Sequence, residues 1–202
     1  DNEKQMLNYL YEIGDIMDDI FWTQNYGGDK ETFLNSIEDK DARLFAEINY
    51  GPWNHFDNLA PFLPEYGAMP AGAGFYPADM TKEEFEAWDN PDKTSQYTLI
   101  TRDENGNLQA VWFHEAYAEK IQKAADLLLK AADLAGDEEF ANYLRLRSKA
   151  LLTDDYFESD MAWMDVRNNN VDFVVGPIEN YVDALYGYKA AHEAFILIKD
   201  HA

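Results

Sequence analysis

Apolar side chains near the amino end of the chain recur at steps of three and four residues, which places them on one face of a helix. This stripe extends from Met6 to Phe21 and predicts a helix over residues 3–22, which Asn25-Tyr26-Gly27-Gly28 terminates. A capping box at Thr81 starts another predicted helix, and Gly136 is the expected C-cap of a third. In all, further helices are predicted over residues 30–36, 39–47, 81–88, 115–134, 137–152 and 155–164.

Strand signals are fewer. Two short segments flank Asp103-Glu104-Asn105-Gly106, and the Asn-Gly pair predicts a hairpin near residues 97–113. Residues 171–176 are rich in β-branched side chains and predict a strand. The apolar run over residues 188–199 is ambiguous by periodicity alone. These patterns predict an α+β fold that is mainly α-helical, with a small antiparallel β part.

Regular structure fades between residues 49 and 77, where proline and glycine are frequent. Proline removes a backbone donor and glycine costs conformational entropy, so neither a helix nor an inner strand is expected there. Aromatic residues are interspersed, which predicts an irregular segment pinned to an apolar surface. Long ordered segments of this kind are often functional.

Composition and charge exclude several classes of partner. The 202 residues include 39 Asp and Glu against 16 Lys and Arg, a net charge of −23, so we expect no nucleic-acid partner. The same acidity suits solubility and, in a groove, attraction of a peptide's amino terminus. The absence of cysteine excludes disulfides and thiolate metal sites, and no apolar run is long enough to span a membrane. No signal peptide is recognised. Because the first residue is Asp1 and not methionine, the compartment stays open: it is the cytoplasm or, if a leader was removed, the periplasm or cell envelope.

Two His-Glu pairs raise the question of a zinc site. A His-Glu-x-x-His helix carries two imidazoles on one face, where both reach the metal. Four residues after His114 and His192 the chain has Ala118 and Ile196, and neither is a ligand. We therefore expect no metal-binding residue, no catalytic residue and no cofactor in this chain. His114 is interpreted as a residue at the start of a helix, and His192 as a partly buried one.

An acidic cluster, Asp154-Asp155-Tyr156-Phe157-Glu158, is similar to the aspartate-rich motif with which terpene synthases hold Mg²⁺. No second such motif accompanies it, and the chain has few basic residues to hold a diphosphate. The favoured interpretation is an N-cap cluster, in which Asp154 or Asp155 accepts hydrogen bonds from the free amides of a helix start.

Polar residues also gather between the apolar runs 171–175 and 188–199. This segment reads Gly176-Pro177-Ile178-Glu179-Asn180-Tyr181-Val182-Asp183 and places carboxylates at a strand end, where sites are often built. A purely structural turn is the alternative.

The same segment resembles the dipeptidyl peptidase III family, which carries Gly-x-Ile-Glu-Ser-Tyr-x-Asp. The residues after it, 187–199, match as well, and three further segments resemble the bacterial branch, so that the similarity covers nearly the whole chain. These segments are Asn49-Tyr50-Gly51-Pro52-Trp53, Leu151-Leu152-Thr153-Asp154-Asp155-Tyr156 and Ala162-Trp163-Met164-Asp165.

The resemblance implies a two-lobed zinc exopeptidase that removes dipeptides from peptide amino termini. It places residues 188–199 on a strand, and the zinc-binding His-Glu-x-x-Gly-His helix beyond Ala202. The family's acid-x-Tyr pair, which holds the substrate's amino end, falls by position on Asp172 and Val174; the acid is kept in type, and the tyrosine is not. This departure puts strict dipeptide specificity in doubt.

The sequence thus predicts that residues 1–202 form a single N-terminal domain or lobe fragment of a larger zinc peptidase, inactive alone. Its expected partners are the remainder of the same polypeptide and a peptide substrate. Two alternatives stay open: a stand-alone, non-catalytic peptide-binding module, and an acid–base hydrolase that uses Glu179 and Asp183. The predicted substrate-binding residues are Asp172, Glu179, Asn180, Tyr181 and Asp183.

Overall fold

The computed structural model describes residues 2–200, which form two compact units. The first unit contains the chain up to Ile20, Trp112–Ile178 and the chain from His192 onward. The second unit contains Phe21–Val111 and Glu179–Ala191. Helix α1 (Asn2–Tyr26) and strand β5 (Val171–Glu179) each begin in the first unit and end in the second.

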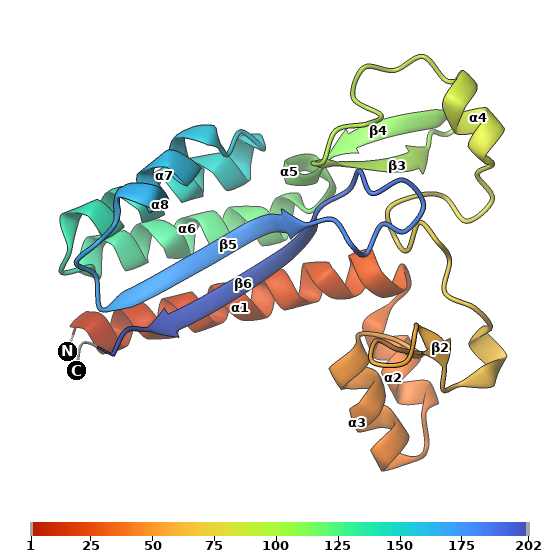
Figure 1. The fold of residues 1–202 in the computed structure, drawn as a ribbon, viewed down its shortest axis with the longest axis horizontal. Helices are drawn as coiled ribbons and strands as arrows, with labels where there is room; N and C mark the ends of the chain where they lie inside the picture. Colours follow the sequence, from red (N-terminus) through yellow and green to blue (C-terminus); the bar gives the residue numbers. More distant parts are fainter. Residues whose placement is uncertain (1, 201–202) are drawn as a thin grey trace. The chain divides into compact units, whose positions relative to one another are not determined.

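The first unit combines helices with one two-stranded sheet. Strand β5 pairs with β6 (Ala191–Ile198), and Figure 1 shows the two strands antiparallel, lying along α1. The helices of this unit besides α1 are α5 (Phe113–Ala116), α6 (Ala118–Leu134), α7 (Glu138–Thr153) and α8 (Phe157–Asp165). The prediction of a mainly helical α+β fold with a small antiparallel part is confirmed.

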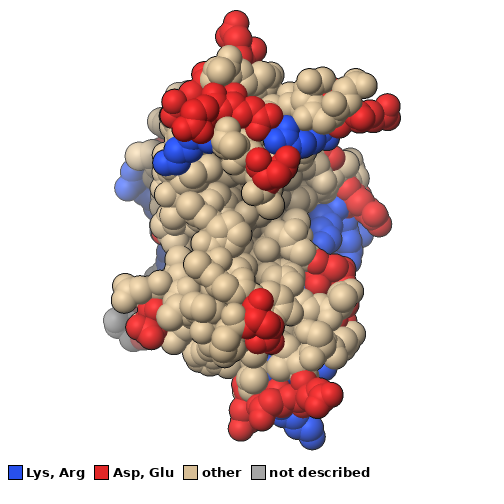
Figure 2. Space-filling model, turned by 90° about the vertical axis from the view of Figure 1, so that its right-hand side faces the viewer, with Lys and Arg blue, Asp and Glu red and all other residues tan. Residues whose placement is uncertain are grey.

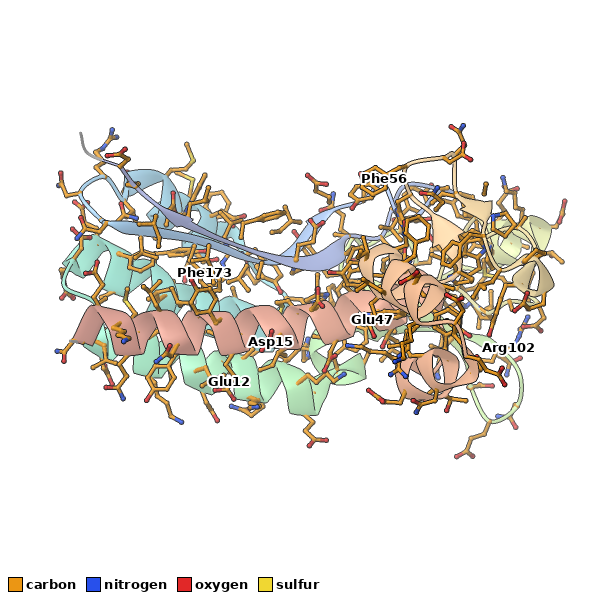
Figure 3. All side chains as sticks on the ribbon, turned by 90° about the horizontal axis from the view of Figure 1, so that it is seen from below. Glu12, Asp15, Glu47, Phe56, Arg102 and Phe173 are labelled. Atoms are coloured by element: carbon orange, nitrogen blue, oxygen red, sulfur yellow. The ribbon has the colours of Figure 1, made fainter. Side chains whose placement is uncertain are left out.

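The core of the first unit is built on the apolar stripe of α1. Leu10, Ile13 and Met17 are fully buried, as the three- and four-residue spacing predicted. Phe173 of β5 is also fully buried, and Figure 3 shows it between the strand and α1. Alternate residues of β5 from Val171 to Val175 are buried, which is the period of a strand with one face in the core.

His192 lies on β6, so the strand predicted over residues 188–199 is confirmed, with bounds at Ala191 and Ile198. The expectation of a partly buried imidazole was wrong, because His192 is 0% exposed. Its ring packs 5.1 Å from that of Phe113 and 5.7 Å from that of Tyr117, measured between centroids. Burial lowers the pKa of His192 to about 3.

The predicted helix over residues 115–134 ends at Leu134, as predicted, but its start and its cap differ from the prediction. Tyr117 adopts φ −117° and ψ 28°, which separates the short helix α5 from α6. Gly136 was wrongly expected to be the C-cap, because α6 ends at Leu134 and Ala135 caps it in an extended conformation. Ala135 donates its N–H to the carbonyl of Ala132, so no left-handed glycine is needed.

The second unit contains short elements joined by irregular segments. After the end of α1 it contains α2 (Lys30–Ser36), α3 (Lys40–Asn49) and α4 (Lys82–Ala87), and the 3₁₀-helix η1 (Pro64–Tyr66). Its strands are β1 (Trp53–Asn54), β2 (Ala60–Pro61), β3 (Thr98–Arg102) and β4 (Leu108–Trp112). Strands β1 and β2 pair antiparallel, and β3 pairs with β4 as the predicted hairpin.

The segment between residues 49 and 77 is irregular, as predicted, and aromatic side chains hold it in place. Trp53 donates its indole N–H to the carbonyl of Gly67 over 2.9 Å. Gly74 packs so closely on the end of α1 that an added Cβ would lie 2.1 Å from the carbonyl oxygen of Thr23. Four non-glycine residues here adopt positive φ, which L side chains rarely do: Tyr50, Asn58, Leu59 and Ala73.

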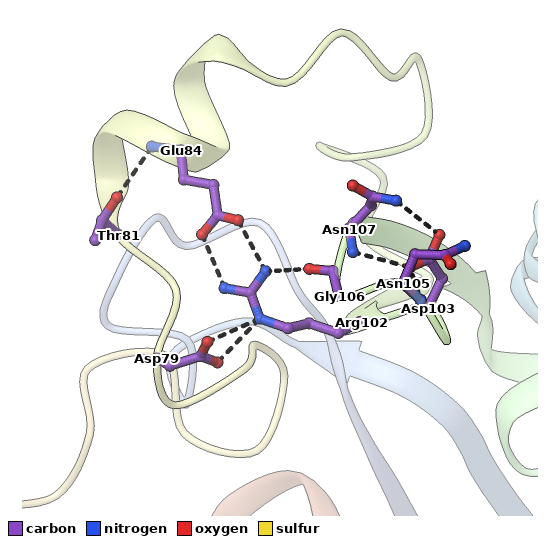
Figure 4. A network of polar contacts seen from close by, with 8 residues as sticks. All are labelled: Asp79, Thr81, Glu84, Arg102, Asp103, Asn105, Gly106 and Asn107. Carbon is purple, nitrogen blue, oxygen red and sulfur yellow. Dashed lines mark hydrogen bonds and ion pairs between the residues drawn. The ribbon is translucent and has the colours of Figure 1, made fainter.

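A charged network ties α4 to the β3–β4 hairpin (Figure 4). Arg102 of β3 donates to both carboxylate oxygens of Glu84, over 2.8 and 2.9 Å, and to Asp79 over 2.9 Å. The same guanidinium donates to the carbonyl of Gly106 in the hairpin turn. Thr81 accepts from the amide of Glu84, which confirms half of the predicted capping box.

Acidic side chains outnumber basic ones on the face shown in Figure 2, in keeping with the net charge of −23. Within residues 2–200, no helix combines the length and apolar character needed to cross a membrane.

Candidate functional site

Asp172 lies on β5 in the first unit and is half-buried. Its Oδ1 accepts a 3.0 Å hydrogen bond from the indole nitrogen of Trp163 on α8. Val174 lies two residues further on and is also half-buried, so both side chains project from the same face of the strand. Burial raises the pKa of Tyr143 to about 12, and the negative charge of Asp172 contributes to the rise.

Gly176 allows β5 to pass over a layer of aromatic and basic side chains. It adopts φ 125°, and an added Cβ would lie 3.3 Å from Cε1 of Tyr156 and 3.7 Å from Nη1 of Arg147. The Arg147 guanidinium lies 5.4 Å from the ring centroid of Tyr143 and 5.2 Å from that of Tyr156, and it pairs with Asp160. The geometry therefore requires glycine at this position of the strand.

Strand β5 ends at Glu179, which belongs to the second unit, and a loop follows it there. Glu179 and Asn180 are exposed, and Tyr181 is 58% exposed. Asn180 donates its side-chain amide to the carbonyl of Gly187 over 2.7 Å, which fixes the mouth of the loop. Two of the predicted residues, Glu179 and Tyr181, are thus displayed to solvent on an ordered segment.

Asp183 is buried, at 2% exposure, and its carboxylate organises the loop. Oδ1 accepts from the amides of Leu185 and Tyr186, and Oδ2 accepts from the amides of Tyr188 and Lys189. Five donors therefore surround the carboxylate, the fifth being the hydroxyl of Tyr76. This saturation does not support an acid–base pair of Asp183 with Glu179, because such a group needs access to a substrate.

Lys189 is a buried cation that sequence reasoning missed. Its Nζ donates to the carbonyls of Lys93 and Ser95 and to the hydroxyl of Thr98, over 2.8 to 2.9 Å. Burial lowers the pKa of Lys189 to about 8, and the charge of Asp183 opposes this shift. No local pattern could have identified it, because its partners lie more than ninety positions earlier in the chain.

The acidic cluster at the end of α7 differs from its predicted role. Asp154 is the left-handed C-cap of α7, at φ 54°, and its carboxylate accepts from the amide of His114 over 3.0 Å. Its Oδ2 also lies 2.7 Å from Nδ1 of His114. The N-cap interpretation was wrong for Asp154, because its carboxylate instead holds the start of α5, where His114 was expected to lie. For Asp155 the interpretation is confirmed, because its Oδ1 accepts a 3.4 Å hydrogen bond from the amide of Phe157, the first residue of α8. Burial raises the pKa of Asp154, and the contacts with His114 oppose the rise.

The described residues do not fit a metal centre. No group of three or more His, Cys, Asp or Glu side chains in residues 2–200 is placed to hold an ion. His114 and His192 lie on different elements, α5 and β6, so neither His-Glu pair belongs to a long helix.

Two solved structures are similar to this chain over nearly all of its length. One is dipeptidyl peptidase III from Caldithrix abyssi, at 39% identity and a TM-score of 0.90, covering 100% of this chain and 40% of that one. The other is dipeptidyl-peptidase III from Corallococcus sp. strain EGB, at 33% identity and a TM-score of 0.91, covering 98% of this chain and 39% of that one.

The chain matches an N-terminal fragment of the dipeptidyl peptidase III family. It spans about two fifths of the length of the bacterial dipeptidyl peptidase III structures. The resemblance to the dipeptidyl peptidase III family is therefore confirmed, and the similarity supports a peptidase-related N-terminal part.

Among curated proteins, a plant relative carries a different name. Nudix hydrolase 3 of Arabidopsis thaliana is 29% identical over 259 residues, covering 98% of this chain and 33% of the plant protein. This chain corresponds to only a third of it, whereas the dipeptidyl peptidase III structures match at higher identity. No family model matches the chain.

The five predicted substrate-binding residues differ in their exposure and in the contacts that they make. Asp172 belongs to the first unit, and Glu179, Asn180, Tyr181 and Asp183 belong to the second. Glu179 and Tyr181 are accessible, Asn180 and Asp183 hold the loop, and Asp172 is held by an indole that sequence reasoning missed. Trp163 does lie in a segment that resembles the bacterial branch, but a linear motif cannot show which side chain its N–H reaches.

Proposed function

We propose that this chain is the N-terminal part of a dipeptidyl-peptidase-III-like, zinc-dependent exopeptidase and contributes to binding of the peptide substrate. The observation that carries the proposal is the match of the whole chain to dipeptidyl peptidase III of Caldithrix abyssi, at 39% identity and a TM-score of 0.90. The activity of the whole protein, its substrates and its partners are all part of this proposal.

In this proposal the zinc ion is held by residues outside the chain. The described part of the chain has no set of ligands that fits the metal, so the chain supplies binding surface rather than the metal centre. The chain alone is accordingly inactive, and the remainder of the polypeptide provides the chemistry.

An exopeptidase that acts at amino termini must recognise a free ammonium group, and a carboxylate supplies the opposite charge. A hydrogen bond between such charged groups contributes about 1.5–3 kcal/mol when water is displaced, and little when both groups stay exposed. The carboxylate that binds the substrate must therefore differ from the many acids of the general surface.

Asp172 meets this requirement within the first unit. It is half-buried and held by a neutral donor, Trp163, and no basic side chain within residues 2–200 forms an ion pair with it. Val174 stands on the same face, where the family resemblance implies a tyrosine. The smaller side chain leaves more room beside the proposed ammonium site, which is consistent with a relaxed choice of substrate.

Within the second unit, Glu179 and Tyr181 are the residues proposed to contact the peptide. Asn180 and Asp183 contribute by fixing the loop, through the carbonyl of Gly187 and through the donors around the Asp183 carboxylate. An ordered loop presents its side chains without the entropy loss that a flexible one would suffer on binding.

The experiment substitutes each acid in the full-length polypeptide, as Asp172→Asn and Glu179→Gln, and measures kcat and KM for free-amine peptides. We expect at least one variant to raise KM about tenfold or more, which corresponds to the loss of one charge-assisted hydrogen bond. Zinc content should stay at the wild-type value. Wild-type kcat/KM in both variants would show that the segment is only structural.

A further inference from the structure

We propose that Asn105, in the turn of the β3–β4 hairpin, is a site of spontaneous deamidation, and that the hydrogen bonds of the turn set the rate of this modification. Asn105-Gly106 is the single Asn-Gly pair in the sequence. An asparagine followed by glycine is chemically labile, because no side chain on the next residue hinders attack of its backbone nitrogen on the asparagine amide. The inference is independent of the proposed peptidase function and adds a modification site to the second unit.

The two reacting residues are open to solvent. Asn105 and Gly106 are both exposed, and within residues 2–200 no hydrogen bond holds the side-chain amide of Asn105. Gly106 adopts φ 85°, and an added Cβ there would meet nothing within 4 Å. The structure thus leaves space for the Asn105 side chain to rotate and for water to enter.

The reaction needs only the chain and water. The backbone nitrogen of Gly106 gives up its proton and attacks Cγ of Asn105, so that a bond forms between these two atoms. The bond from Cγ to Nδ2 breaks, and Nδ2 leaves as ammonia with the proton that Gly106 has lost. Water then opens the cyclic imide. Opening at Cγ gives aspartate, and opening at the backbone carbonyl gives isoaspartate, in which the main chain is longer by one methylene group.

The turn restrains the attacking nitrogen. The N–H of Gly106 donates to the carbonyl of Asp103 over 3.0 Å, which is the hydrogen bond of a β-turn. Oδ1 of Asp103 accepts from the amides of Asn105 and Asn107 over 2.9 and 2.8 Å, and Arg102 donates to the carbonyl of Gly106 over 2.8 Å. These bonds must open before the nitrogen can attack, so the rate follows the fraction of time that the turn is open.

The products disturb the network in Figure 4. Isoaspartate lengthens the turn and moves the carbonyl of Gly106 away from Arg102. Both products add a carboxylate close to Asp103, where like charges repel. Because Arg102 also binds Glu84 and Asp79, the change reaches the contact between the hairpin and α4. The modified protein should therefore unfold at a lower temperature than the intact one.

Incubation of the full-length polypeptide at 37 °C and pH 7.4 tests the site, with peptide mapping by mass spectrometry over time. We expect Asn105 to deamidate before every other asparagine, with both aspartate and isoaspartate as products. Asn58 is the matched comparison, because it is also exposed and the amide of Leu59 after it also donates to a backbone carbonyl over 3.0 Å. It differs in having leucine where Asn105 has glycine.

Two further comparisons test the restraint. A synthetic peptide with the sequence of residues 100–110 gives the rate without the folded turn, and Asn105 should react more slowly in the protein. Asp103→Ala removes two hydrogen bonds to a carboxylate, so it should raise the rate in the protein about tenfold or more. Glu104→Gln is the control variant, because it removes a neighbouring charge and none of these bonds, and it should leave the rate unchanged.

Each part of the proposal can fail by itself. If Asn58 or another asparagine reacts first, Asn105 is not the modification site. If Asn105 reacts as fast in the wild-type protein as in the peptide, the turn does not restrain it, and this comparison needs no variant to fold. Equal rates in the wild type and Asp103→Ala would likewise overturn the role of the turn.

Discussion

The hydroxyl of Tyr76 donates a 2.8 Å hydrogen bond to Oδ2 of Asp183, although 107 positions separate the two residues. Both belong to the second unit, where this bond joins the irregular segment before α4 to the loop after β5. Burial and the neighbouring carboxylate raise the pKa of Tyr76 well above its usual value, so the hydroxyl keeps its proton and remains a donor.

We expect Tyr76→Phe to lower the free energy of unfolding by about 0.5–1.5 kcal/mol, the net value of one hydrogen bond. Asp183 retains four backbone donors, so the loop should persist. Urea denaturation of both proteins measures the difference. Tyr11→Phe is the matched control, because Tyr11 is 54% exposed and its hydroxyl should contribute nothing measurable. Equal stability of the two variants would contradict this account of the loop.

His192 should make the protein sensitive to acid. Burial lowers its pKa from 6.5 to about 3, so between these values the unfolded chain binds a proton that the folded chain does not. Acid therefore favours unfolding, and the contribution of His192 to stability is lost as the pH falls through this window. The expected slope is about 1.4 kcal/mol per pH unit.

The measurement compares wild type with His192→Gln between pH 4 and pH 7, by urea denaturation at each pH. The variant should be less stable at pH 7, and the difference should shrink as the pH falls, because glutamine does not titrate. The many carboxylates of the chain affect both proteins alike and cancel in the difference. A constant difference across the range would show that His192 takes up its proton as readily in the folded state as in the unfolded state, contrary to the lowered pKa.

Substitution by alanine should have opposite effects on stability at Gly176 and at Gly14, a glycine within a helix. Gly176→Ala should destabilise the protein by about 1–3 kcal/mol, because alanine is strained at φ 125° and its Cβ would press on Tyr156. Gly14→Ala is the control: it lies in α1 with open space around it, so the substitution should stabilise by roughly 0.5–1 kcal/mol. Opposite signs in thermal or urea denaturation are the expected result, and equal signs would contradict it.

The isolated chain should bind no stoichiometric zinc. Ala118 and Ile196 stand where a His-Glu-x-x-His helix would need its second histidine, and the chain has no cysteine. Metal analysis of the dialysed protein decides the matter, with added zinc removed by gel filtration before measurement. One tightly held zinc per chain would show that residues far apart in the sequence form a site after all.

Local signals predicted most of the secondary structure. The stripe from Met6 to Phe21, the Thr81 capping box and the Asn105-Gly106 turn each depend on residues within a few positions of one another. The structure confirms all three, with changed bounds for the helices. Gly136 shows the limit of such signals, because a helix can also end on an extended alanine whose amide bonds back to the last turn.

Contacts between distant segments could not be predicted in this way. The five donors around Asp183, the carbonyls around Lys189 and the capping of α5 by Asp154 all depend on how separate elements pack. Burial of His192 is of the same kind, since it follows from the rings of Phe113 and Tyr117. The site residues Asp172 and Glu179 came from a family resemblance and a cluster of polar residues, and their role stays a prediction.

Release of dipeptides by the full-length polypeptide tests the central claim most directly. A free-amine pentapeptide and its N-acetylated form are incubated with the enzyme, with and without a chelator, and the products are identified by mass spectrometry. The account predicts dipeptides from the free-amine peptide alone, loss of activity with the chelator and recovery on adding zinc. Absence of dipeptide release, or cleavage that persists with the chelator, would contradict it.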